Sequence, residues 1–164
     1  MGLLLPGYMP RGVVAVLNLL QADTTAAVTT ETMAYQLPFV AAPKRIYRVH
    51  LGVYIVDTNT TGDGTATSFP AKNSAVIRAR WAQGSSVTIT GTPFGASRAT
   101  VFNDDNSTAG SADSTFYLFN PPAGQVTVGV SIAPVRAAAT YGAVSLSPST
   151  GSHLVIEDVG PYAE

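Results

Sequence analysis

The most restrictive feature of this sequence is an alternation of apolar and small polar side chains with a period of two residues. Between residues 125 and 133, every second residue is a β-branched aliphatic one: Val126, Val128, Val130 and Ile132. Successive side chains of a strand point to opposite faces, whereas a helix would scatter this set around its circumference. The pattern therefore predicts a strand that buries these residues and turns Thr127, Gly129 and Ser131 toward solvent.

Residues 45–57 alternate in the same way. The predicted inward set is Tyr47, Val49, Leu51, Val53 and Ile55, and the predicted outward set is Arg48, His50, Gly52 and Tyr54. Six further segments rich in β-branched or aromatic residues are also predicted to be strands: 75–82, 86–91, 98–102, 115–119, 141–146 and 153–159. The segment 13–20 fits a helical stripe and a strand, and its β-branched residues favour a strand.

The segments between these strands are dominated by Gly, Pro, Asn, Asp and Ser, which favour chain reversals. About eight to ten short strands with turns at such spacing are typical of an all-β sandwich or barrel. We therefore predict an antiparallel, jelly-roll-like β-sandwich. The 164 residues are divided into an extended apolar N-terminal arm at 1–12 and one sandwich domain at 13–164.

The arm is predicted to make contacts rather than to form a regular element of its own. Prolines at positions 6 and 10 prevent a regular helix and disfavour a central strand. The arm therefore either lies on its own sandwich or docks on a neighbouring subunit. For docking, the candidate interface residues are its apolar ones: Leu3, Leu4, Leu5, Pro6, Tyr8 and Met9.

Charged residues make up 12% of the chain, against about 25% in ordinary soluble proteins. The net charge of −1, without a basic run, argues against nucleic acid as a partner. No apolar stretch approaches the length of a membrane span, and the N-terminus lacks the basic region of a signal peptide, so we expect a chain without membrane contact that is made in a cytoplasm. Predicted strand faces without charge favour association with other subunits.

Candidate catalytic and metal-binding residues are few. Ser97 stands in a Gly-Ala-Ser-Arg-Ala segment that lacks the final glycine of a nucleophile elbow. His50 and His153 are expected to be solvated or interface side chains, because nothing near them in the sequence supplies a catalytic partner. Residues 57–63 have part of the spacing of a calcium loop but lack its acidic twelfth position. We therefore expect a non-enzymatic protein without a cofactor or metal, and leave calcium at 57–63 open.

Three segments resemble a known family. They are the C-terminal GSHLVIEDVGP at 151–161, the PKRIYRV at 43–49 and the GVVA at 12–15. These segments are similar to those of small β-rich virion proteins from tailed phages of actinobacteria. The resemblance implies a structural virion component that decorates or stabilises the capsid surface or forms part of the tail. It also implies other virion proteins, major capsid or tail subunits, as partners and a homo-oligomeric state, a trimer being one option.

A second hypothesis remains open. A receptor- or carbohydrate-binding module on the virion would use the loops predicted at 58–67 and 103–114. Sugar binding needs exposed aromatic rings, and Tyr54 and Tyr117 are the candidates on outward strand faces. Trp81, which alternates with Ile77 and Ala79, is expected in the core.

Overall fold

The computed structural model describes residues 11–59, 71–103, 110–136 and 143–162, without the side chains of residues 59, 71, 72, 102 and 103. This part of the chain contains nine strands and one short 3₁₀ helix. Their bounds are β1 Gly12–Asn18, η2 Gln21–Asp23, β2 Thr32–Ala41, β3 Arg45–Asn59, β4 Ala71–Gln83, β5 Thr92–Asn103, β6 Gly110–Phe119, β7 Gly124–Pro134, β8 Ala143–Ser147 and β9 His153–Pro161.

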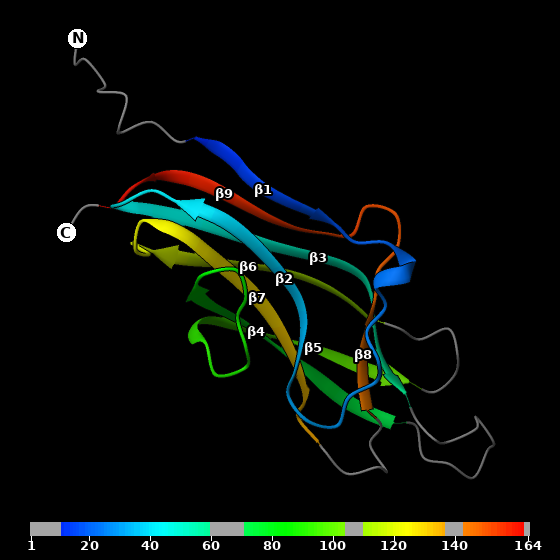
Figure 1. Ribbon diagram of the computed structural model, residues 1–164. Helices are drawn as coiled ribbons and strands as arrows, with labels where there is room; N and C mark the ends of the chain where they lie inside the picture. The colour runs from blue at the N-terminus through cyan, green and yellow to red at the C-terminus, as the bar shows by residue number, and fades with distance from the viewer. Residues whose placement is uncertain (1–10, 60–70, 104–109, 137–142, 163–164) are drawn as a thin grey trace.

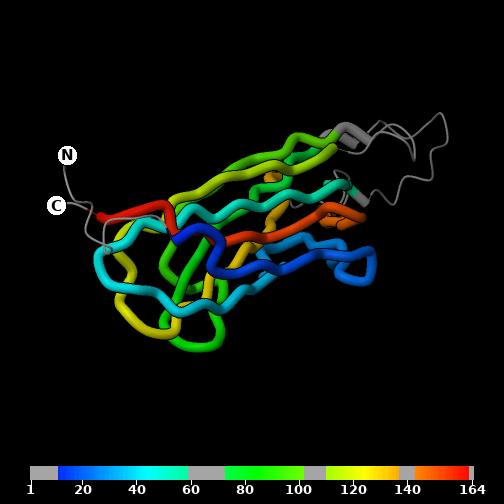
Figure 2. The backbone as a smooth tube through the Cα atoms, turned by 90° about the horizontal axis from the view of Figure 1, so that it is seen from above, coloured from blue at the N-terminus to red at the C-terminus, as the bar shows by residue number. Residues whose placement is uncertain are grey.

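The strands form two antiparallel sheets that pack face to face (Figure 1). The first sheet has the order β1-β9-β3-β6, with β8 paired to the far end of β3, and the second has the order β2-β7-β4-β5. Figure 2 shows blue β1 running beside orange-red β9 along one margin of the first sheet. If β8 is set aside and β9 is counted as the eighth strand, the two sheets have the strand orders 1-8-3-6 and 2-7-4-5, which is the jelly-roll arrangement. The predicted antiparallel sandwich is thus confirmed.

The core lies between the two sheets and is built from the inward sets of the alternating strands. β3 contributes Tyr47, Val49, Leu51 and Val53, and β7 contributes Val126, Val128, Val130 and Ile132. The register of β3 shifts between Val53 and Val56. Because a bulge adds one residue to the strand, the inward positions after it are Val56 and Thr58 rather than the predicted Ile55.

Two predicted boundaries are wrong. Residues 86–91 form no strand; they belong to a loop at 84–91 that joins β4 to β5. The predicted loop at 103–114 is too long, because β6 already begins at Gly110. Strand β2, which alternates Tyr35, Leu37, Phe39 and Ala41 into the core, was not predicted. Its Pro38 is tolerated because β2 is an edge strand.

Candidate functional site on the outer face of the first sheet

The predicted interface residues Leu3, Leu4, Leu5, Pro6, Tyr8 and Met9 lie outside the described residues, as do residues 60–70 and 104–109 of the two predicted binding loops. Of the candidate calcium segment, Asp57 and Thr58 are in β3, and residues 60–63 are outside the described part. The site is therefore built from the outer faces of the two sheets.

The outer face of the second sheet is covered at β7, contrary to the prediction. Thr127 and Ser131 are fully buried, and Gly129 is buried between them. The loop at 84–91, called the covering loop below, folds over this part of β7 (Figure 1): the Thr127 hydroxyl donates to the Gly84 carbonyl at 2.7 Å. A Cβ atom on Gly129 would lie 2.4 Å from Cγ1 of Val87. The small side chains thus make room for the protein's own loop.

A charged cluster around Glu31 lies beside Ser131 on this face. Glu31 Oε1 accepts from Arg80 Nε at 3.0 Å and from the Ser131 hydroxyl at 2.7 Å, and Oε2 accepts from Arg78 at 3.1 Å. Burial alone would raise the pKa of Glu31, but the bonds from Ser131 and Arg80 and the two guanidinium charges outweigh it and hold this pKa below its usual value. Arg80 also donates to the Gly91 carbonyl, which connects the cluster to the covering loop.

The outer face of the first sheet, in contrast, presents apolar and aromatic side chains to solvent. The strand register aligns three rows across it. They are Val13–Glu157–Arg48–Tyr117, Val16–Val155–His50–Thr115 and Asn18–His153–Gly52–Asp113. Val13, Val16, Tyr54, Tyr117 and Phe119 are exposed on this sheet. The expected outward positions of Tyr54 and Tyr117 are confirmed.

Three aromatic rings form a group at one end of this face. Tyr117 and Phe119 stack with ring centroids 6.3 Å apart, and Phe119 lies 6.3 Å from Tyr162. Phe119, which has ring contacts with both Tyr117 and Tyr162, is 58% exposed, although phenylalanine is among the residues most often buried. Beside them, Arg48 forms an ion pair with Glu157 across β3 and β9. The end of the face therefore combines apolar rings with a compensated pair of charges.

His50 on β3 and His153 on β9 lie side by side on this face, away from the aromatic group, although nothing in the sequence links them. Nδ1 of His50 lies 3.0 Å from Nε2 of His153. Nε2 of His50 lies 2.8 Å from a carboxylate oxygen of Asp113, and Nδ1 of His153 lies 2.8 Å from the Gly151 carbonyl. Gly52 stands between Asp113 and His153 in the register, so no side chain on β3 separates them. No sequence motif predicts this cluster, because it depends on how β3 pairs with β6 and β9.

The remaining candidates have structural roles. Ser97 lies on the regular strand β5 and shares a hydrogen bond of 2.7 Å with Ser114. Asp158 is buried and accepts from Arg45, with Nη2 of Arg45 at 2.6 Å from Oδ1, whereas its neighbour Glu157 points outward. The two neighbouring acids therefore occupy opposite faces of β9. Trp81 packs partly buried against the core.

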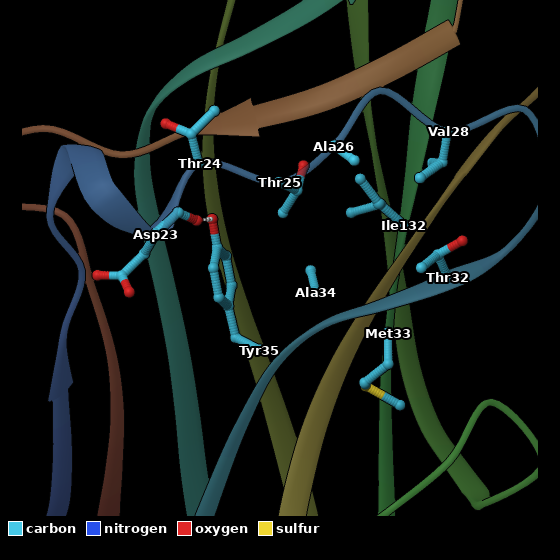
Figure 3. A pocket seen from close by; sticks show the side chains of 10 residues that line it. All are labelled: Asp23, Thr24, Thr25, Ala26, Val28, Thr32, Met33, Ala34, Tyr35 and Ile132. Carbon is cyan, nitrogen blue, oxygen red and sulfur yellow. Dashed lines mark hydrogen bonds between the residues drawn. The ribbon is translucent and has the colours of Figure 1, made fainter.

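A half-open pocket of about 270 Å³ lies between the segment after η2 and β2 (Figure 3). Asp23, Thr24, Thr25 and Tyr35 supply its polar lining, while Val28, Met33 and Ile132 supply apolar surface. The Tyr35 hydroxyl donates to the Asp23 carbonyl at 3.2 Å, so it braces the pocket wall. Burial, and after it the charge of Asp23, raises the pKa of the Tyr35 phenol far above its ordinary value.

Fold and surface together define a jelly-roll sandwich in which the covering loop lies over the middle of one outer face, while the other outer face carries exposed aromatic side chains. Among the described residues, no helix is long and apolar enough to cross a membrane. The chain belongs to the family described as "Domain of unknown function (DUF7298)", whose match extends over residues 1–164. The curated proteins contain no match to the chain.

Proposed function

We propose that the protein is a non-enzymatic structural subunit of a virion, of the kind that the segments at 12–15, 43–49 and 151–161 resemble. It decorates or stabilises the capsid surface, or forms part of the tail, and it contacts other virion subunits and copies of itself. The observation that carries the proposal is the contrast between the two sheets. The middle of the outer face of the second sheet, at Thr127 and Gly129 of β7, is closed by the covering loop, whereas the first sheet exposes Tyr117, Phe119 and Val16.

Clustered exposed apolar side chains mark interaction surfaces more often than free surfaces. The aromatic group suits such a role, since tyrosine and phenylalanine are enriched in the cores of interfaces. The jelly roll adds support by analogy, because capsid and lectin domains both use it. The expected assembly surface is therefore the outer face of the first sheet rather than the small residues of β7. The N-terminal arm is expected to provide a second contact.

Replacing Tyr117 and Phe119 together by serine tests the face. Light scattering after size-exclusion chromatography is expected to show an oligomer for the wild type and a smaller species for the double variant. Val40→Ser is the matched control, because Val40 is 77% exposed but lies on β2 in the other sheet. An oligomer of unchanged mass in the double variant would contradict the role of this face.

Deleting residues 1–10 tests the arm. The truncated protein is expected to be lost from assembled particles, because burial of apolar arm residues at about 25 cal/mol per Å² would no longer hold it there. Unchanged incorporation would refute the anchoring role and leave the outer face as the contact.

A second candidate function is a carbohydrate- or receptor-binding module. The exposed rings of Tyr117 and Phe119 beside the polar Arg48 and Glu157 favour it, since such a surface offers apolar ring faces together with hydrogen-bonding groups. A glycan array probed with the assembled protein tests it. Specific signals that disappear in the serine double variant would support this function, and the absence of specific signals would count against it.

A further inference from the structure

The two histidines of the chain are its only imidazoles, and the chain has no cysteine. They are 103 residues apart in sequence, yet β3 and β9 bring His50 Nδ1 and His153 Nε2 to 3.0 Å. The rings are tilted by 54° with centroids 4.9 Å apart, so they meet by their edges at two nitrogens rather than by stacking. Such a meeting of two titratable ligand groups requires a chemical explanation.

The outer nitrogen of each ring faces an acceptor. For His50 it is the Asp113 carboxylate, and for His153 it is the Gly151 carbonyl, each at 2.8 Å. A carboxylate or carbonyl oxygen only accepts, so each of these outer nitrogens must carry a hydrogen. In a neutral imidazole the other nitrogen then bears a lone pair. When both rings are neutral, His50 and His153 direct two lone pairs toward each other, and a cation between them, either a proton shared as a hydrogen bond or a metal ion, removes that repulsion.

We propose that His50 and His153 bind a divalent late transition-metal ion, with Zn²⁺ as the probe. Zinc is bound by imidazole nitrogens at about 2.0–2.1 Å, and a tetrahedral angle then separates two nitrogens by about 3.3 Å. The observed separation is a few tenths of an ångström shorter, which small ring rotations supply. A ligating histidine usually donates its other N–H to a carboxylate or backbone carbonyl, and both kinds of partner are in place here.

The surroundings are compatible with an added cation. Asp113 contributes a negative charge next to His50, and Arg48, the cation in the adjacent row of β3, is already paired with Glu157. A Cβ atom on Gly52 would lie 3.0 Å from Cε1 of His153, so glycine leaves the space that the ring occupies. Within the described residues no group of three or more His, Cys, Asp or Glu side chains is placed to hold a metal ion, so an ion bound by the two histidines would complete its coordination with water.

Isothermal titration of the full-length protein with Zn²⁺ near neutral pH tests the proposal. The expected result is one ion per chain, with affinity at least tenfold weaker in His50→Gln and in His153→Gln. Asp113→Asn is expected to weaken binding by about ten- to a hundredfold, as for other outer partners of ligating histidines. Glu157→Gln is the matched control, because it removes a carboxylate from the same face without touching either ring.

Gly52→Ala supplies a variant that keeps both ligands and displaces only the ring of His153, and it is expected to weaken binding as well. Circular dichroism checks that each variant keeps its sheet content. Zinc affinity equal in the wild type and in both histidine variants would overturn the proposal. Equal losses in Asp113→Asn and Glu157→Gln would assign the effect to net charge and overturn it too. Absence of zinc binding by the wild type would likewise overturn the proposal.

Discussion

Asp158→Asn is the substitution for which the structure predicts the largest effect. Arg45 and Asp158 are 3% and 1% exposed, and the guanidinium donates to both carboxylate oxygens, with Nε at 2.9 Å from each. Asp158 also accepts from the Gly160 amide at 3.2 Å. Asparagine keeps the shape of the side chain but removes its charge, so the buried arginine loses its carboxylate.

Removing one partner of a buried ion pair costs about 3–5 kcal/mol, because the remaining charge stays in a medium that solvates it poorly. This is a large part of the roughly 5–15 kcal/mol by which a domain is stable. Replacing both partners with apolar residues, as in Arg45→Met with Asp158→Leu, leaves no buried charge behind, because Arg11, whose Nε lies 3.8 Å from Asp158, is exposed. The double variant is therefore expected to be more stable than Asp158→Asn, despite carrying two substitutions.

Urea unfolding followed by tryptophan fluorescence measures these differences. The assay requires the slope of the free energy against urea concentration to stay constant among variants, so that midpoint shifts report stability. A loss of less than about 1 kcal/mol in Asp158→Asn would show that the pair behaves like an exposed one. A double variant less stable than the single one would refute the argument from charge burial.

Three further predictions concern the second sheet and the pocket. Gly129→Val places a Cβ 2.4 Å from Val87 and 2.8 Å from Met33, so it should cost about 1–3 kcal/mol and increase proteolysis within the covering loop; unchanged protease resistance would contradict this packing. The pKa of Glu31 is lowered in the folded protein, so its contribution to stability is present above its ordinary value of 4.5 and is lost as the pH falls through the lowered pKa; in Glu31→Gln the melting temperature should depend less on pH in this acidic range. The pKa of Tyr35 is raised in the folded protein, so stability should fall as the pH rises above 10.0, where the tyrosine of the unfolded chain ionises first. Tyr35→Phe should reduce that alkaline loss of stability and should cost about 0.5–1.5 kcal/mol at neutral pH, because it removes a hydrogen bond. An equal alkaline loss in the wild type and in Tyr35→Phe would be the contrary result.

The alternation of side chains was sufficient to predict the sandwich, because the inward sets of β3 and β7 have a period that only a strand satisfies. It was not sufficient to tell which neutral face meets solvent. Thr127 and Ser131 look like solvent-facing positions in the sequence, but Thr127 is bonded to the covering loop, which itself resembles a strand, and Ser131 is bonded to Glu31. A valine such as Val87 is as suitable for a strand as for a loop that packs on a sheet, so its residue type does not predict which of the two it forms; tertiary packing determines that.

The site depended on long-range pairing that no local pattern contains. Gly52 looked like one more outward position, yet the register places Asp113 and His153 on either side of it. The exposure of Tyr117 was predictable from alternation, whereas its stacking with Phe119 and the nearby Tyr162 required the fold. The contacts predicted for the arm, and the binding role predicted for residues 60–67 and 104–109 of the two loops, stay predictions, because these residues lie outside the described part of the chain.

Electron cryo-microscopy of purified virions shows directly which face of the protein is in contact with other subunits. Density for this jelly roll is expected on the capsid or tail, with the outer face of β1, β9, β3 and β6 covered by a neighbouring subunit and the covering loop of the second sheet directed elsewhere. Particles that lack this protein, or particles in which Tyr117 and Phe119 face solvent while the second sheet makes the contacts, would contradict it.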